Sequence, residues 1–121
     1  MEINTKNLIE KIPKEVSHVT NTLEKGGFEA YLVGGCVRDL IMSETLKNEG
    51  ERKPKDWDIT TNATPEEIVT LYPKTFYENT YGTVGVVNED VPMNDEGVLD
   101  ETLRVVEVTP YRVESSYSDN R

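Results

Sequence analysis

Cysteine, histidine and basic residues are all scarce in this sequence. The single cysteine among 121 residues, Cys36, excludes an internal disulfide and argues against a cysteine-based metal site. Lysine and arginine total 13 against 23 aspartates and glutamates, which gives a formal net charge of −10 at pH 7. Because binding to a phosphate backbone is driven by basic surface, we do not expect this chain to hold nucleic acid by itself.

Long apolar runs are also missing. No stretch approaches the roughly 18 apolar residues of a membrane span, and residues 1–15 lack the basic start and apolar core of a signal peptide. We therefore expect no membrane partner and a cytoplasmic location. The hydrophobic share of 36% and the charged share of 30% are typical of a folded chain, and the length predicts one domain, residues 1–121.

Helical and extended patterns alternate along the chain. Helical spacing is found in residues 13–25, 36–42 and 64–72, and the last of these segments begins with a Thr-Pro-Glu-Glu capping box. Extended patterns predict strands at residues 28–33, 56–61, 75–79, 83–88 and 102–112. Residues 43–55 and the acidic residues 89–101 are predicted to be loops, and we expect residues 44–53 to be mobile.

Two aspartates flank a tryptophan in the predicted strand 56–61. The period of two places Asp56 and Asp58 on one face, roughly 6–7 Å apart, with Trp57 directed to the core. Two carboxylates so close repel each other unless a cation lies between them, and oxygen ligands suit Mg²⁺. The alternative is a pair of solvated acids at a strand edge, and the Asp-x-Asp pattern alone does not separate the two.

A glycine pair precedes the second predicted helix. Gly34 and Gly35 follow an apolar strand, and Arg38 falls in the first turns of the helix after them. Glycines let a phosphate approach the backbone, the helix N-terminus offers unpaired N–H groups, and an arginine grips phosphate oxygens. The alternative is an ordinary turn from strand to helix with a surface arginine.

One carboxylate interrupts the apolar strand near the end of the chain. Glu107 lies among Val105, Val106 and Val108, and an acid in such a strand needs a partner. A metal ion shared with the two aspartates would satisfy it. A salt bridge to Arg104 or Arg112 is the alternative.

Four segments taken together resemble the head of class II tRNA nucleotidyltransferases, the CCA-adding enzymes, and the related bacterial poly(A) polymerases. These segments are YLVGGCVRDL, KDWDITTNATPEEI, YGTVGVV and VVEVTPYR. The resemblance covers residues 13–121. It implies the α+β, polymerase-β-like nucleotidyltransferase fold, a mixed β-sheet with helices packed on one side.

The resemblance also implies a site and a reaction. The triphosphate of CTP or ATP would be bound by Gly34, Gly35 and Arg38. Mg²⁺ would be bound by Asp56, Asp58 and Glu107, which form the catalytic carboxylate set. The reaction implied is transfer of CMP or AMP to the 3′-hydroxyl of tRNA with release of pyrophosphate.

Several parts of the family pattern do not follow within these residues. The arginine-rich motif with its Asp-Phe-Thr core, the base-selecting segment and the tRNA-binding helical domains are missing from residues 1–121. We therefore expect a catalytic head fragment that is inactive by itself. Poly(A) addition is the close alternative, and a non-catalytic nucleotide-binding module of the same fold is the second one. The sequence does not indicate the oligomeric state.

Overall fold

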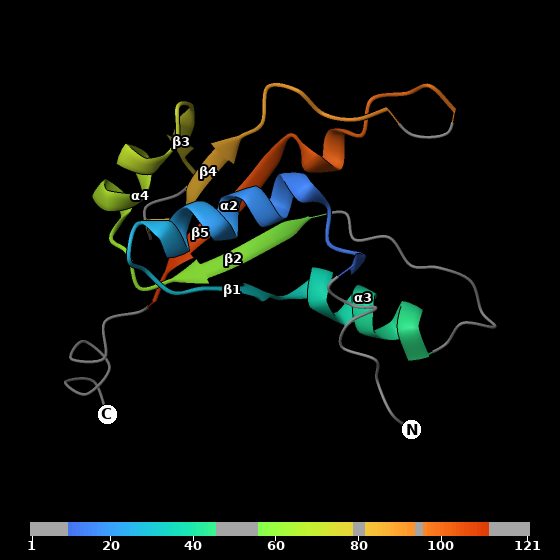
Figure 1. The fold of residues 1–121 in the computed structure, drawn as a ribbon, viewed down its shortest axis with the longest axis horizontal. Coiled ribbons are helices and arrows are strands. Elements are labelled where there is room, and N and C mark those ends of the chain that lie inside the picture. Colours follow the sequence, from blue (N-terminus) through green and yellow to red (C-terminus); the bar gives the residue numbers. More distant parts are fainter. Residues whose placement is uncertain (1–9, 46–55, 79–81, 94–95, 112–121) are drawn as a thin grey trace.

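A five-stranded sheet and the helices beside it make up the part of the chain that the structure describes (Figure 1). This computed structural model describes residues 10–45, 56–78, 82–93 and 96–111. The elements are, in chain order, α2 (Lys14–Lys25), β1 (Ala30–Val33), α3 (Gly35–Thr45), β2 (Trp57–Thr61), α4 (Pro65–Leu71), β3 (Thr75–Tyr77), β4 (Val84–Val87), η2 (Glu101–Leu103) and β5 (Val105–Pro110). None of the helices in these residues is long and apolar enough to cross a bilayer.

The sheet is mixed, with strand order β1-β2-β5-β4-β3. Strands β2 and β5 are parallel, and the other neighbouring pairs are antiparallel. The parallel pair joins strands that are far apart in the sequence. It places Asp58 opposite Glu107.

The two faces of the sheet differ in what covers them. Figure 1 shows α2 lying across one face, and both α2 and α4 contact strands of the sheet and each other. Side chains alternate between the faces along each strand. Alternate residues of β2 (Trp57, Ile59 and Thr61) and of β5 (Val106 and Val108) are buried beneath these helices. We call this side the core face and the opposite side the open face.

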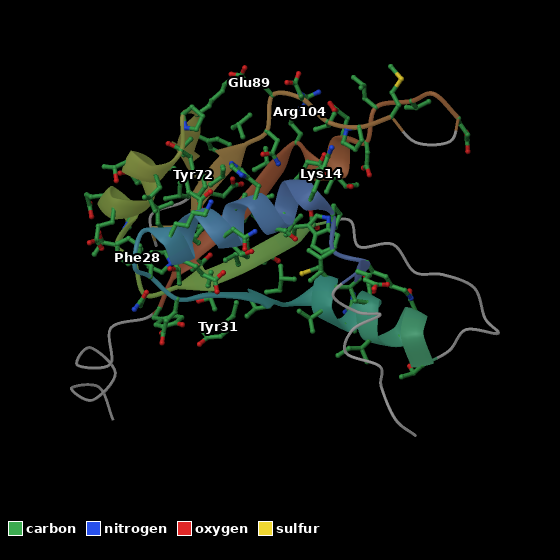
Figure 2. The ribbon with its side chains drawn as sticks, viewed as in Figure 1. Lys14, Phe28, Tyr31, Tyr72, Glu89 and Arg104 are labelled. Atoms are coloured by element: carbon green, nitrogen blue, oxygen red, sulfur yellow. The ribbon has the colours of Figure 1, made fainter. Side chains whose placement is uncertain are left out.

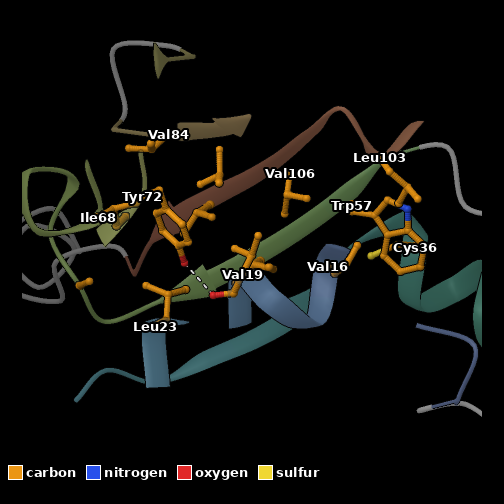
Figure 3. Close-up of a cluster of buried hydrophobic side chains, with 14 of the residues drawn as sticks. Val16, Val19, Leu23, Cys36, Trp57, Ile68, Tyr72, Val84, Leu103 and Val106 are labelled. Atoms are coloured by element: carbon orange, nitrogen blue, oxygen red, sulfur yellow. Dashed lines mark hydrogen bonds between the residues drawn. The ribbon is translucent and has the colours of Figure 1, made fainter. Parts of the chain in front are cut away.

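Helix α2 packs through a stripe of apolar residues at helical spacing. Val16, Val19 and Leu23 are fully buried, and Ile68 of α4 joins them (Figure 3). The hydroxyl of Tyr72 donates a hydrogen bond of 2.6 Å to the carbonyl oxygen of Val19, so its polar atom is satisfied inside the core. The core therefore ties the end of α4 to the middle of α2.

Most of the expected elements are confirmed, with differences at their ends. The capping box at Thr64 and Glu67 is formed, because each side chain accepts a hydrogen bond from the other residue's backbone N–H. Helix α3 runs to Thr45, so the prediction of a loop from Ser43 was wrong for its first three residues. The helix continues there although Ser43 is buried, and the hydroxyl of Thr45 donates a hydrogen bond of 2.9 Å to the carbonyl oxygen of Ile41, one turn earlier. The expected mobile segment, residues 44–53, lies almost wholly outside the described residues.

The last strand begins later than expected. Residues 101–103 form the 3₁₀ helix η2, and the backbone N–H of Thr102 donates to the side chain of Asp100, which caps it. Strand β5 starts only at Val105. The sequence signal was misleading because Thr102 and Leu103 are as compatible with a strand as with a turn, and the cap at Asp100 decides between them.

Candidate active site

A row of paired residues crosses the open face of the sheet from one edge to the other. Its members are, in the strand order β1, β2, β5, β4 and β3, Val33, Asp58, Glu107, Gly85 and Phe76. Residues paired in this way point to the same face of a sheet. The row therefore brings two carboxylates together at the middle of the open face, with a strand end on one side and an aromatic ring on the other.

The glycine turn lies directly beside one of these carboxylates. Gly34 has a φ of +82°, which side-chain-bearing residues rarely adopt. A Cβ atom added to Gly34 would lie 3.2 Å from Oδ2 of Asp58. The backbone of the turn from β1 to α3 thus lies directly against the Asp58 carboxylate, with no room to spare for a side chain at Gly34. The positive φ favours glycine here, and a Cβ atom would crowd the Asp58 carboxylate.

Arg38 lies above this turn, in the first turn of α3. Its backbone N–H donates to the carbonyl oxygen of Gly34 over 3.3 Å, and a Cβ added to Gly35 would lie 3.4 Å from its Nη2 atom. The side chain is 70% exposed, and Nε lies 3.5 Å from Oδ1 of Asp39. The guanidinium is therefore held near the N-terminus of α3, whose first N–H groups have no partner within the helix.

Asp58 and Glu107 are coupled electrostatically. Burial raises the pKa of Glu107 to about 7, and a hydrogen bond with the Asp58 side chain and the negative charges of Asp58, Glu78 and Asp56 add to the effect. A carboxyl group near half-protonation at neutral pH lies between other acids. Such a group is stabilised by either a proton or a cation.

Asp56 lies outside the strand that carries Asp58. Strand β2 begins at Trp57, so Asp56 precedes it and is exposed. The expectation that both aspartates stand within one strand was therefore wrong at this boundary. Among the residues that the structure describes, no group of three His, Cys, Asp or Glu side chains is placed to hold a metal ion. The structure pairs Asp58 with Glu107, and the negative charge of Asp56 also acts on Glu107.

The alternative partner for Glu107 is engaged elsewhere. The guanidinium of Arg104 forms a salt bridge of 2.9 Å with Glu101 and donates to the backbone carbonyls of Asn88 and Glu89. Figure 2 shows Arg104 close to Glu89. Arg112, the other candidate, lies outside the described residues. The salt-bridge interpretation thus fails for Arg104.

Two neighbours of the site behave as their sequence positions indicate. Trp57 is buried in the core, as predicted. Cys36 is also buried, and its Sγ donates to the carbonyl oxygen of Val33 over 3.2 Å. Burial raises the pKa of the Cys36 thiol. This thiol is therefore a packed side chain and not an activated nucleophile.

The far half of the open-face row was not expected from the sequence. Gly85 is buried in β4, and the ring of Phe76 covers it from β3. A signal was present, because a glycine inside an apolar strand marks a close approach by another group. That the approaching group is the ring of Phe76 follows only from the pairing of β3 with β4, which the sequence does not give.

Comparison with known proteins places these features in a family. Residues 30–121 match the model of the poly A polymerase head domain. The CCA-adding enzyme of Geobacillus sp. (strain WCH70) is 38% identical over 104 residues, which cover 85% of this chain and 20% of that protein. The chain thus spans about a fifth of the length of the curated relatives that it matches.

Solved structures show the same fold. The crystal structure of the Bacillus stearothermophilus CCA-adding enzyme in complex with CTP superposes with a TM-score of 0.61 at 31% identity, covering 85% of this chain and 21% of that one. The Thermotoga maritima CCA-adding enzyme complexed with tRNA gives a TM-score of 0.59 at 18% identity over 93% of this chain and 25% of that one. The mixed sheet and these likenesses confirm the expected polymerase-β-like fold. The family model of the poly A polymerase head domain matches most of the sequence, and the chain therefore belongs to that family.

Proposed function

We propose that this chain is the catalytic head of a template-independent RNA nucleotidyltransferase that adds CMP and AMP to the 3′ end of tRNA. The observation that carries the proposal is the open-face row, which sets Asp58 and Glu107 side by side next to the Gly34 turn. The relatives that bear the name CCA-adding enzyme, one of them solved with CTP, support this reading. The cytoplasmic location remains a prediction of the sequence.

The glycine turn and the arginine would bind the triphosphate. A phosphate can approach Gly34 and Gly35 because neither carries a side chain, and the helix N-terminus and the Arg38 guanidinium both favour negative charge. These groups lie at the β1 edge of the open face. The β- and γ-phosphates would therefore lie at that edge, beside Asp58.

The carboxylates fit a divalent cation in combination with the nucleotide. Mg²⁺ is typically bound by one or two carboxylates together with substrate phosphates, which suits the adjacent pair Asp58 and Glu107, with Asp56 as an outer contributor. We propose Mg²⁺ at this position, where it would acidify the attacking hydroxyl and neutralise charge on the leaving pyrophosphate. The chain's own groups hold the triphosphate in place and orient its α-phosphorus toward the middle of the sheet.

The reaction is an in-line displacement. The 3′-oxygen of the RNA forms a bond to the α-phosphorus, the bond from that phosphorus to the bridging oxygen breaks, and pyrophosphate leaves as the hydroxyl proton passes to water. Arg38 and the N–H groups at Gly35 stabilise the negative charge that builds up on the leaving group. Poly(A) addition uses the same steps, and the described residues contain no observation that favours it over CCA addition.

The decisive test replaces one carboxylate. Asp58→Asn is expected to lower nucleotide incorporation by at least about 100-fold, since even outer-shell changes at metal sites cost about 10–100-fold. The assay requires the remaining four fifths of a relative, so it uses a chimera in which this chain replaces the aligned segment of the Geobacillus enzyme. Asp90→Asn, an exposed loop acid, is the matched control. Turnover by the Asp58→Asn chimera near that of the unaltered one would refute the assignment.

A further inference from the structure

Phe76 occupies the end of the open-face row that is opposite to the glycine turn. It pairs with Gly85, which in turn pairs with Glu107, so its side chain is on the same face as the carboxylates. The residue is 42% exposed. An aromatic ring thus stands partly open to solvent at the β3 edge of the candidate active site.

The ring is held by the glycine beneath it. A Cβ added to Gly85 would lie 2.5 Å from Cζ and 2.6 Å from Cε1 of Phe76, so the ring occupies the space of the missing side chain. Covering a strand glycine with an aromatic ring stabilises a sheet, and this explains why the ring lies over β4. Covering the glycine uses one side of the Phe76 ring and does not explain why the other side is left exposed.

The direction of the proposed reaction gives this exposed ring a role. The leaving pyrophosphate lies at the β1 edge, near Gly34 and Arg38, and the attacking oxygen must come from the opposite side of the α-phosphorus. The opposite side of the carboxylates is occupied by β4 and β3. With strands about 4.8 Å apart, Gly85 lies roughly 10 Å from Asp58, a distance comparable with the length of one nucleotide.

Charge favours a base over a phosphate at this edge. Glu78, directly after β3, acts on Glu107 through its negative charge, so this part of the face is acidic. A phosphate would be repelled here, whereas an uncharged base can stack on an aromatic ring. The ring and its acidic surroundings therefore suit the base of a nucleotide whose sugar points toward the carboxylates.

We propose that Phe76 stacks on the base of the 3′-terminal nucleotide of the RNA acceptor and so positions its 3′-hydroxyl for attack. This inference rests on the proposed function. Stacking on a ring is tolerant of base identity. Such a contact suits an acceptor whose terminal base is not the same at every addition.

The test uses the 121-residue chain and a trinucleotide RNA ending in CC, with Mg²⁺ and a non-hydrolysable CTP analogue present. The RNA is added at millimolar concentration, because a chain of net charge −10 should hold so short an RNA only weakly. The chain has only two phenylalanines, so selective labelling gives two ring signals, with Phe28 as an internal reference. We expect RNA to shift the Phe76 ring signals and leave those of Phe28 in place. Phe76→Leu, which keeps an apolar cover on Gly85, should weaken RNA binding about fivefold or more, because base stacking contributes that much or more to affinity.

Two further variants separate stacking from structure. Phe76→Tyr keeps the ring and should retain RNA binding. Tyr77→Leu alters the adjacent residue, which points to the opposite face and is 58% exposed, and it should also retain RNA binding. In the chimera, Phe76→Leu should raise the KM for tRNA and leave that for CTP unchanged. Unmoved Phe76 signals, or equal RNA affinity in Phe76→Leu and the unaltered chain, would overturn the inference.

The proposed function is read out separately in the same samples. The CTP analogue should shift the amide signals of Gly34 and Gly35. If it does not, the proposed function fails. If it does and RNA leaves Phe76 untouched, only the role of Phe76 fails.

Discussion

The two faces of this sheet are built from the same strands and serve different ends. On the core face, Ile59 and Val108 are fully buried beneath α2 and α4, so contacts there stabilise the fold. On the open face, their neighbours Asp58 and Glu107 bring like charges together, which costs stability unless a cation or a proton is present. The comparison teaches that neighbouring residues of one strand can have different roles, because one side chain stabilises the core and the next contributes to the candidate active site.

The largest effect is expected on the core face. Ile59→Ala should lower the free energy of unfolding by about 2–5 kcal/mol, because it leaves a cavity at a fully buried position. Thr60→Ala, the adjacent residue on the open face, removes a 3.1 Å hydrogen bond to the carbonyl oxygen of Thr109 and should cost about 1 kcal/mol. Urea unfolding followed by circular dichroism measures both. Equal losses would show that the two faces do not differ in this way.

Two glycines with positive φ sharpen the comparison further. Gly34→Ala and Gly27→Ala each force a left-handed conformation and should each cost about 1–2 kcal/mol in stability. Only the first also places a methyl group 3.2 Å from Asp58, whereas nothing lies within 4 Å of a Cβ at Gly27. Calorimetry should therefore show lost Mg²⁺-nucleotide binding in Gly34→Ala alone. If Gly34→Ala still binds the Mg²⁺-nucleotide, the triphosphate does not bind at this turn.

The pKa of Glu107 predicts how pH acts on the open face. Its folded-state pKa of about 7 exceeds the ordinary value of 4.5, so the folded chain holds this proton more tightly than the unfolded chain does. The stability that the proton provides is complete below pH 4.5 and is lost as pH rises through about 7. Glu107→Gln, which mimics the protonated form, should match the unaltered chain at low pH. It should exceed it by about 1 kcal/mol at high pH, a value reduced for solvent screening.

Urea unfolding across this pH range, with and without Mg²⁺, measures the difference. Mg²⁺ should narrow the gap, because a cation relieves the same repulsion in the unaltered chain. A gap that does not depend on pH would mean that Glu107 ionises normally and that the carboxylates do not interact.

Local patterns in the sequence predicted the near half of the site and not its far half. The strand, glycine turn and helix around Gly34 are contiguous, so spacing alone sets their geometry. The approach of Glu107 to Asp58 depends on parallel pairing of segments far apart in the chain. The residue pattern offered it as one of two alternatives for Glu107, and the family resemblance favoured it. The ring of Phe76 over Gly85 follows from the β3–β4 register, which no residue pattern specified. Asp56 was misplaced by one residue because strand ends depend on pairing partners.

The smallest effect concerns the choice among bases. The groups assigned to the nucleotide are backbone N–H groups at Gly35, the Arg38 guanidinium and the carboxylates, and all of them address the triphosphate or its metal ion. No described residue has been placed against the Watson–Crick edge of a bound base. The 121-residue chain should therefore bind CTP, ATP, GTP and UTP with affinities within about threefold, less than a typical hydrogen bond contributes. Isothermal titration with each Mg²⁺-nucleotide measures this, and clear selection of CTP would show that residues 1–121 read the base as well as the phosphates.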